Sequence, residues 1–116
     1  MIVEDDDDLR GMIGSAVADA GYAAVEAADG AAALEACEER DPDVVLLDLN
    51  MPRLGGEGFA EAYRRGRGQA KIIVMSGTAS GGEISARLRA DAFLSKPFDL
   101  ERLVGAVNRA LDPATA

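Results

Sequence analysis

Two short apolar runs in this sequence end in carboxylates. Ile2-Val3 is followed directly by Glu4-Asp5, and the continuously apolar residues 44–47 are followed by Asp48. An apolar run without alternation is typical of a strand that is buried on both faces of a parallel sheet. Ligands of such sheets bind at the carboxyl ends of the strands, so three carboxylates would share one cleft if these two strands are neighbours.

Two further apolar runs end in a hydroxyl and an amine. Residues 72–75 precede Ser76, and residues 92–95 precede Lys96, which is one of only two lysines. Three adjacent carboxylates need a counter-charge, which Lys96 and a divalent cation would supply. Because the donors are oxygens, Mg²⁺ is favoured over zinc. A carboxylate held beside Mg²⁺ and a lysine can attack phosphorus and form an aspartyl phosphate.

The elements that must position these groups alternate between strand and helix. Helical spacing of apolar residues, aspartates at the expected helix starts and Gly or Pro at the ends define the boundaries. The pattern predicts an α/β fold, in which a parallel sheet is covered by helices on both faces. The expected strands are 2–3, 22–27, 44–47, 72–75 and 92–95, and the expected helices are 9–20, 30–40, 57–66, 81–89 and 100–111.

Length and composition narrow the class of protein. The chain has 116 residues, of which 48% are hydrophobic, so one folded domain is expected rather than a disordered segment. Neither a signal peptide nor an apolar run near the ~20 residues of a membrane span is visible, which predicts a cytoplasmic protein without membrane insertion. The single cysteine, Cys37, excludes an internal disulfide and fits a reducing compartment. No histidine is present, so the chain cannot itself supply a histidine base, metal ligand or phospho-carrier.

Charge is distributed unevenly along the chain. Residues 1–50 carry a net charge of −12 and residues 51–116 a net charge of +3, which together give −9. This strongly acidic balance disfavours direct binding to nucleic acid. The acidic first half and the basic second half need a structural explanation.

Four motifs together resemble the receiver domain of response regulators in two-component systems. They are Glu4-Asp5 with Leu9-Arg10, Asp48-Leu49-Asn50-Met51-Pro52 with Gly56, Val74-Met75-Ser76-Gly77, and Phe93-Leu94-Ser95-Lys96-Pro97-Phe98. Each motif alone is weak, but their order and spacing match over essentially the whole chain. The resemblance implies a flavodoxin-like (βα)5 three-layer sandwich with strand order 2-1-3-4-5. It also implies that residues 1–116 form a single receiver domain with no effector domain in this chain.

The resemblance implies a metal and phosphoryl site made from both halves of the chain. Asp48 would be the phosphoacceptor and Asp5 a direct Mg²⁺ ligand, with Glu4 acting mainly through water. Asn50 would offer its backbone carbonyl to the metal, and Lys96 would pair with the phosphoryl group.

Three more residues would respond to phosphorylation or shape the site. Ser76 would hydrogen-bond a phosphoryl oxygen, and Phe93 would be the aromatic that turns inward with it. Pro97 follows the lysine where such domains carry a cis peptide bond.

The implied function is a switch that a sensor histidine kinase or phosphotransfer protein phosphorylates and a downstream protein target or output domain reads. The resemblance also allows a homodimer. One alternative is a degenerate receiver that is never phosphorylated and acts as a constitutive interaction module. Another is a Mg²⁺-dependent phosphohydrolase, which would need a second acid at position 50, where this chain has Asn50.

Simpler structural roles compete at several positions. Asp6, Asp7 and Asp8 are better read as a helix cap and solvated loop than as metal ligands. Thr78 competes with Ser76 for the role of switch hydroxyl. Phe93 is also compatible with a place in the core.

Overall fold

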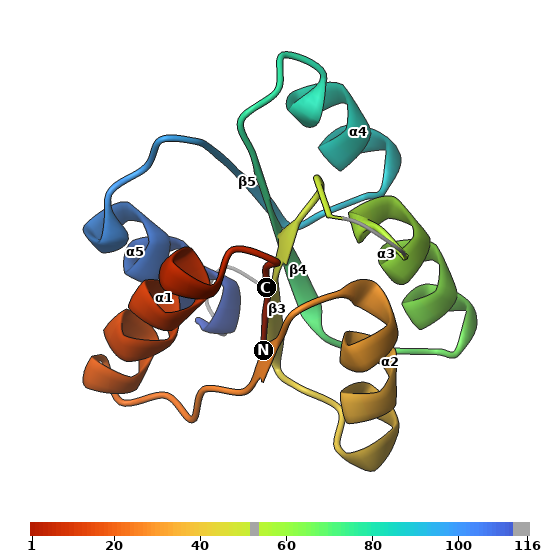
Figure 1. Ribbon diagram of the computed structural model, residues 1–116, viewed down its shortest axis with the longest axis horizontal. Coiled ribbons are helices and arrows are strands. Elements are labelled where there is room, and N and C mark those ends of the chain that lie inside the picture. Colours follow the sequence, from red (N-terminus) through yellow and green to blue (C-terminus); the bar gives the residue numbers. More distant parts are fainter. Residues whose placement is uncertain (52–53, 113–116) are drawn as a thin grey trace.

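The computed structural model describes residues 1–51 and 54–112. Strands and helices alternate along the described chain (Figure 1). The strands are β1 Ile2–Val3, β2 Glu26–Ala27, β3 Val44–Asp48, β4 Lys71–Ser76 and β5 Ala92–Ser95. The helices are α1 Asp7–Asp19, α2 Gly30–Glu39, α3 Gly56–Arg65, α4 Gly81–Arg87 and α5 Leu100–Leu111.

The five strands form one parallel sheet in the order β2-β1-β3-β4-β5, which confirms the expected strand order. Val3 of β1 is in register with Leu47 of β3. The residues that follow these two positions, Glu4 and Asp48, therefore leave neighbouring strands at the same edge of the sheet.

Helices cover both faces of the sheet and produce three layers. α1 and α5 lie together on one face, and α2, α3 and α4 lie on the other (Figure 1). Alternate residues of β3 point into the two cores: Val45 and Leu47 join the α2–α3–α4 side, whereas Val44 and Leu46 join the α1–α5 side. Burial of both sets explains why this strand is apolar throughout.

The second strand is shorter than the expected 22–27. Only Glu26 and Ala27 pair with β1, and they pair with its two residues, Ile2 and Val3. A strand is limited by the length of its neighbour, and the two-residue β1 leaves residues 22–25 without a ladder to join.

Aspartates cap three helices. Asp6, Asp29 and Asp99 each accept a hydrogen bond from the backbone N–H three residues later, at the starts of α1, α2 and α5. Asp6 is therefore a cap, as expected. Asp7 and Asp8, expected in a solvated loop, instead form the exposed first turn of α1, where carboxylates interact favourably with the helix dipole.

Two parts of the sequence-based prediction concern residues that the structure does not describe. Pro52 of the Asp48 motif is one of them, and residues 113–116 at the end of the expected domain are the other. Within the described residues, no helix is both long and apolar enough to span a membrane.

Candidate functional site

The carboxyl edge of the sheet gathers three carboxylates. Glu4 follows β1 and is 1% exposed, and Asp48 ends β3 and is 2% exposed. Asp5, the residue after Glu4, is exposed. One carboxylate oxygen of each residue lies within 4.8 Å of the others. The structure thus brings together the three acids that the strand ends predicted.

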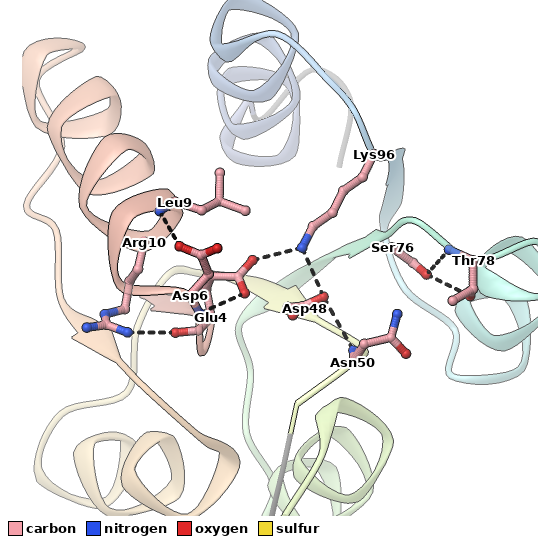
Figure 2. Close-up of polar contacts among 9 residues, drawn as sticks. All are labelled: Glu4, Asp6, Leu9, Arg10, Asp48, Asn50, Ser76, Thr78 and Lys96. Atoms are coloured by element: carbon pink, nitrogen blue, oxygen red, sulfur yellow. Dashed lines mark hydrogen bonds and ion pairs between the residues drawn. The ribbon is translucent and has the colours of Figure 1, made fainter.

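Lys96 joins the two buried carboxylates. Its Nζ donates to Glu4 Oε1 at 2.9 Å and to Asp48 Oδ1 at 3.3 Å (Figure 2). Desolvation lowers the pKa of Lys96, but the hydrogen bond that Lys96 donates to Glu4 and the charge of Asp48 outweigh it, so the net shift is upward. Lys96 is therefore a cation at neutral pH. The peptide bond between Lys96 and Pro97 is cis, as expected.

Backbone contacts fix the two buried acids. Glu4 Oε2 accepts from the amide of Asp6 at 3.3 Å, and Asp48 Oδ1 accepts from the amide of Asn50, also at 3.3 Å (Figure 2). Gly56 is needed beneath Asp48, because a Cβ at this position would lie 2.5 Å from the Asp48 carbonyl oxygen. The start of α3 can therefore approach the strand end only with glycine at position 56.

Arg10 has a structural role that the sequence analysis did not identify. Its Nη1 donates to the carbonyl of Glu4 at 2.9 Å (Figure 2). Its Nη2 donates to Asp7 Oδ1 at 2.6 Å. These contacts connect the end of β1 to the first turns of α1. In the sequence, Arg10 stood out only as part of the motif with Glu4-Asp5, and the motif does not indicate which groups the arginine contacts.

The charge of the cluster is not balanced by the lysine. Desolvation raises the pKa of Asp5, and so do the hydrogen bond that its protonated form donates to Glu4 and the like charge of Glu4. Three carboxylates thus face the single ammonium of Lys96. A hard divalent cation such as Mg²⁺ fits this oxygen-only donor set, whereas zinc would favour nitrogen or sulfur ligands.

Ser76 is fully buried at the end of β4, but its hydroxyl is turned away from the carboxylates. Ser76 Oγ lies 3.0 Å from Thr78 Oγ1 and accepts from the Thr78 amide at 3.2 Å (Figure 2). The two candidate hydroxyls are therefore hydrogen-bonded to each other, and Ser76 is the one buried at the strand end.

Phe93 does not belong to the core. It is 37% exposed and lies on β5, which is an edge strand of the sheet. The start of α4 lies beside it: a Cβ on Gly81 would be 2.7 Å from Ser76 Oγ and 3.1 Å from Phe93 Cε1. α4 therefore contacts both residues expected to switch.

A model of the response regulator receiver domain matches residues 1–108. The chain belongs to this family. Receiver domains are signalling domains of two-component systems.

Individual receiver proteins resemble the chain along nearly its full length. The chemotaxis protein CheY of Bacillus subtilis is 32% identical, covering 97% of this chain and 96% of CheY. The solved CheY4 of Vibrio cholerae superimposes with a TM-score of 0.87 at 30% identity, covering 95% of each chain. The receiver domain of NtrX from Brucella abortus gives a TM-score of 0.88 at 28% identity, covering 97% of each.

Longer regulators match through one part only. The transcriptional regulatory protein PrrA of Mycobacterium bovis is 34% identical over 96% of this chain, which spans 48% of PrrA. The receiver chain thus spans about half the length of these curated relatives. The likeness concerns their receiver part.

Proposed function

We propose that this receiver domain is a phosphorylation-controlled switch in which Asp48 accepts a phosphoryl group from a phosphohistidine. The donor would be a sensor histidine kinase or phosphotransfer protein of the cytoplasm. The supporting observation is the position of Asp48: a buried carboxylate bonded to Lys96 and within 4.8 Å of Glu4 and Asp5.

The proposed step is a displacement at phosphorus. An Asp48 carboxylate oxygen forms the new P–O bond while the P–N bond breaks, and the electron pair remains on the departing imidazole nitrogen. Lys96 is already within hydrogen-bond distance of Asp48, so its ammonium offsets charge on the incoming phosphoryl oxygens. Glu4, Asp5, Asp48 and the carbonyl of Asn50 would hold Mg²⁺, which supplies further charge neutralisation when bound.

The response to phosphorylation would begin at Ser76. Its hydroxyl would give up its hydrogen bonds with Thr78 and bind a phosphoryl oxygen, and the exposed Phe93 would move inward. Gly81 of α4 lies against both side chains, so their movement would alter the surface formed by α4, β5 and α5. A downstream protein target or output domain would read this surface.

Phosphorylation by acetyl phosphate tests the proposal. With Mg²⁺, the protein should give a retarded band on a Phos-tag gel, and Asp48→Asn should abolish it. Asp43→Asn, which removes an exposed carboxylate just before β3, should leave the band unchanged. The absence of a band, or a band that persists in Asp48→Asn, would overturn the assignment of Asp48.

Thermal unfolding with Mg²⁺ separates a phosphorylated switch from a constitutive interaction module. Binding to the folded state raises stability by about 1.4 kcal/mol at a concentration roughly ten times the Kd. We expect millimolar Mg²⁺ to raise the Tm of the native protein and to have little effect on Asp5→Asn. An equal response of both proteins, or none in either, would favour the constitutive module.

A further inference from the structure

A hollow of 560 Å³ opens between α3 and α4, on a part of the surface outside the site just described. Four arginines surround it: Arg64 and Arg65 in the last turn of α3, Arg87 in the last turn of α4, and Arg89 just beyond. We call this surface the arginine hollow. Glu61 also lines it. In Figure 1, the two helices lie next to each other on one face of the sheet.

Two of these arginines have partners within the protein. Arg87 Nη2 pairs with Glu57 at 2.5 Å, which links α4 to the start of α3. Arg64 Nη2 donates to the carbonyl of Arg89 at 3.1 Å. Arg65 and Arg89, by contrast, are exposed, and no acid of residues 1–51 or 54–112 forms an ion pair with either guanidinium.

Ordinary helix electrostatics explain only part of the cluster. Cations are favourable at helix C-termini, which accounts for Arg65 and Arg87. Arg89 lies after α4, however, and has a φ of 56°, a left-handed conformation that disfavours a residue with a Cβ. Its guanidinium adds positive charge at a position where the backbone gives no reason for an arginine.

The floor of the hollow is apolar. Ala60 of α3 and Leu88 at the end of α4 line it, with 1% and 9% exposure. The surface therefore combines a small apolar floor with a basic rim. This combination suits a ligand that presents an apolar side chain between negative charges.

We propose that the arginine hollow is a docking surface for an acidic segment of a partner protein. An apolar side chain of the segment would contact Ala60 and Leu88, and its flanking carboxylates would pair with Arg65 and Arg89. The surface shares the end of α4 with the α4–β5–α5 face but includes no residue of β5 or α5, and docking does not require phosphorylation of Asp48. The proposal therefore stands or falls independently of the proposed function.

Charge complementarity favours an acidic peptide over other anions. The whole chain has a net charge of −9, so long-range repulsion opposes a nucleic acid, and only a locally matched segment gains from the arginines. Inorganic phosphate compounds would match the rim but would make no use of the apolar floor. A peptide uses both parts of the surface.

Fluorescence anisotropy with a labelled peptide of glutamates around one leucine tests the proposal at low ionic strength. The full chain should bind this peptide, and Arg65→Gln with Arg89→Gln should weaken binding by about tenfold, the order expected from loss of two exposed charge pairs. Arg102→Gln removes an exposed arginine from α5 and serves as the matched control, with less than about a twofold effect. Substituting glycine for the leucine of the peptide should also weaken binding.

Four results would overturn the proposal. They are no binding to the native chain at millimolar peptide, equal loss in the control variant, and equal binding of the leucine and glycine peptides. The fourth is displacement of the peptide by inorganic tripolyphosphate at an equal concentration, which would indicate a phosphate site instead.

Discussion

The two edges of the sheet hold buried polar groups in opposite ways. At the amino edge, the hydroxyl of Tyr63 donates to Asp41 Oδ1 at 2.6 Å and accepts from the Ala70 amide at 2.8 Å. At the carboxyl edge, Lys96 contacts the buried carboxylates of Glu4 and Asp48. The phenol is neutral and fully hydrogen-bonded, whereas the carboxylates outnumber the lysine.

This difference separates a structural network from a reactive one. Tyr63 also stacks on Phe59 with ring centroids 5.5 Å apart, so its polar and apolar parts are both satisfied within α3 and its neighbouring loops. The carboxyl edge retains surplus negative charge, which is unfavourable in a buried place. Such a surplus is a reason for function because a cation or a phosphoryl transfer can use it.

Removing the lysine should have the largest effect on stability. Lys96→Met leaves Glu4 and Asp48 buried without their ammonium partner, and we expect the free energy of unfolding to fall by about 3 kcal/mol at pH 7. Urea unfolding measures the change. Lys71→Met, at the amino end of β4, removes the other lysine and should cost less than about 0.5 kcal/mol. Equal losses in both variants would contradict the contrast between the edges.

Crowding at the carboxyl edge should have the second largest effect on stability. Gly81→Ala would place a Cβ 2.7 Å from both Cβ and Oγ of Ser76, so we expect a loss of about 2 kcal/mol from overpacking. Gly82→Ala is the matched control, because its Cβ would meet nothing within 4 Å. The higher helix propensity of alanine should raise the free energy of unfolding by about 0.5 kcal/mol. Thermal unfolding of the two variants should therefore move the Tm in opposite directions, and shifts of the same sign would count against the contact.

The amino edge should respond least, and the contribution of its tyrosine proton to stability should be lost at alkaline pH. Burial and the hydrogen bond to Asp41 raise the pKa of Tyr63 from 10.0 to about 12. The folded protein thus holds the phenol proton more tightly than the unfolded chain does. The stability that this tighter binding of the proton contributes is fully present below pH 10 and is lost as the pH rises through about 12.

The variant Tyr63→Phe measures that contribution. It should destabilise the protein by about 1 kcal/mol at pH 8. Above pH 11 the difference from the native protein should shrink, since the native tyrosine is then losing its proton. A difference that stays constant up to pH 12 would show that the phenol proton has no part in stability.

Local patterns in the sequence predicted the strand ends well. The uninterrupted apolar residues 44–47 and 72–75 became central strands, and their ends delivered Asp48 and Ser76 to one edge of the sheet. The expected strand 22–27 was too long, because its length depends on the two residues of β1 available for pairing. Local propensity carries no information about that partner.

Contacts between distant residues were harder to foresee. Lys96 and Glu4 are separated by 92 positions, and Tyr63 and Asp41 by 22. Strand order alone places Lys96 near the acids, but the atom-to-atom contacts depend on side-chain packing. The exposure of Phe93 and the approach of Gly81 to Ser76 likewise follow from how α4 lies on the sheet, for which the sequence carries no local signal.

The hydrogen bonds between Ser76 and Thr78 also determine how often the Ser76 hydroxyl is released from Thr78. Each such bond contributes about 1 kcal/mol net, so releasing Ser76 Oγ from both without replacement corresponds to a ratio of roughly 30 to 1. In the proposed switch, the unphosphorylated protein would then hold the released form at only a few per cent. Thr78 would thereby limit the background signal, and a phosphoryl group needs to favour the released form by only a few kcal/mol to reverse the ratio.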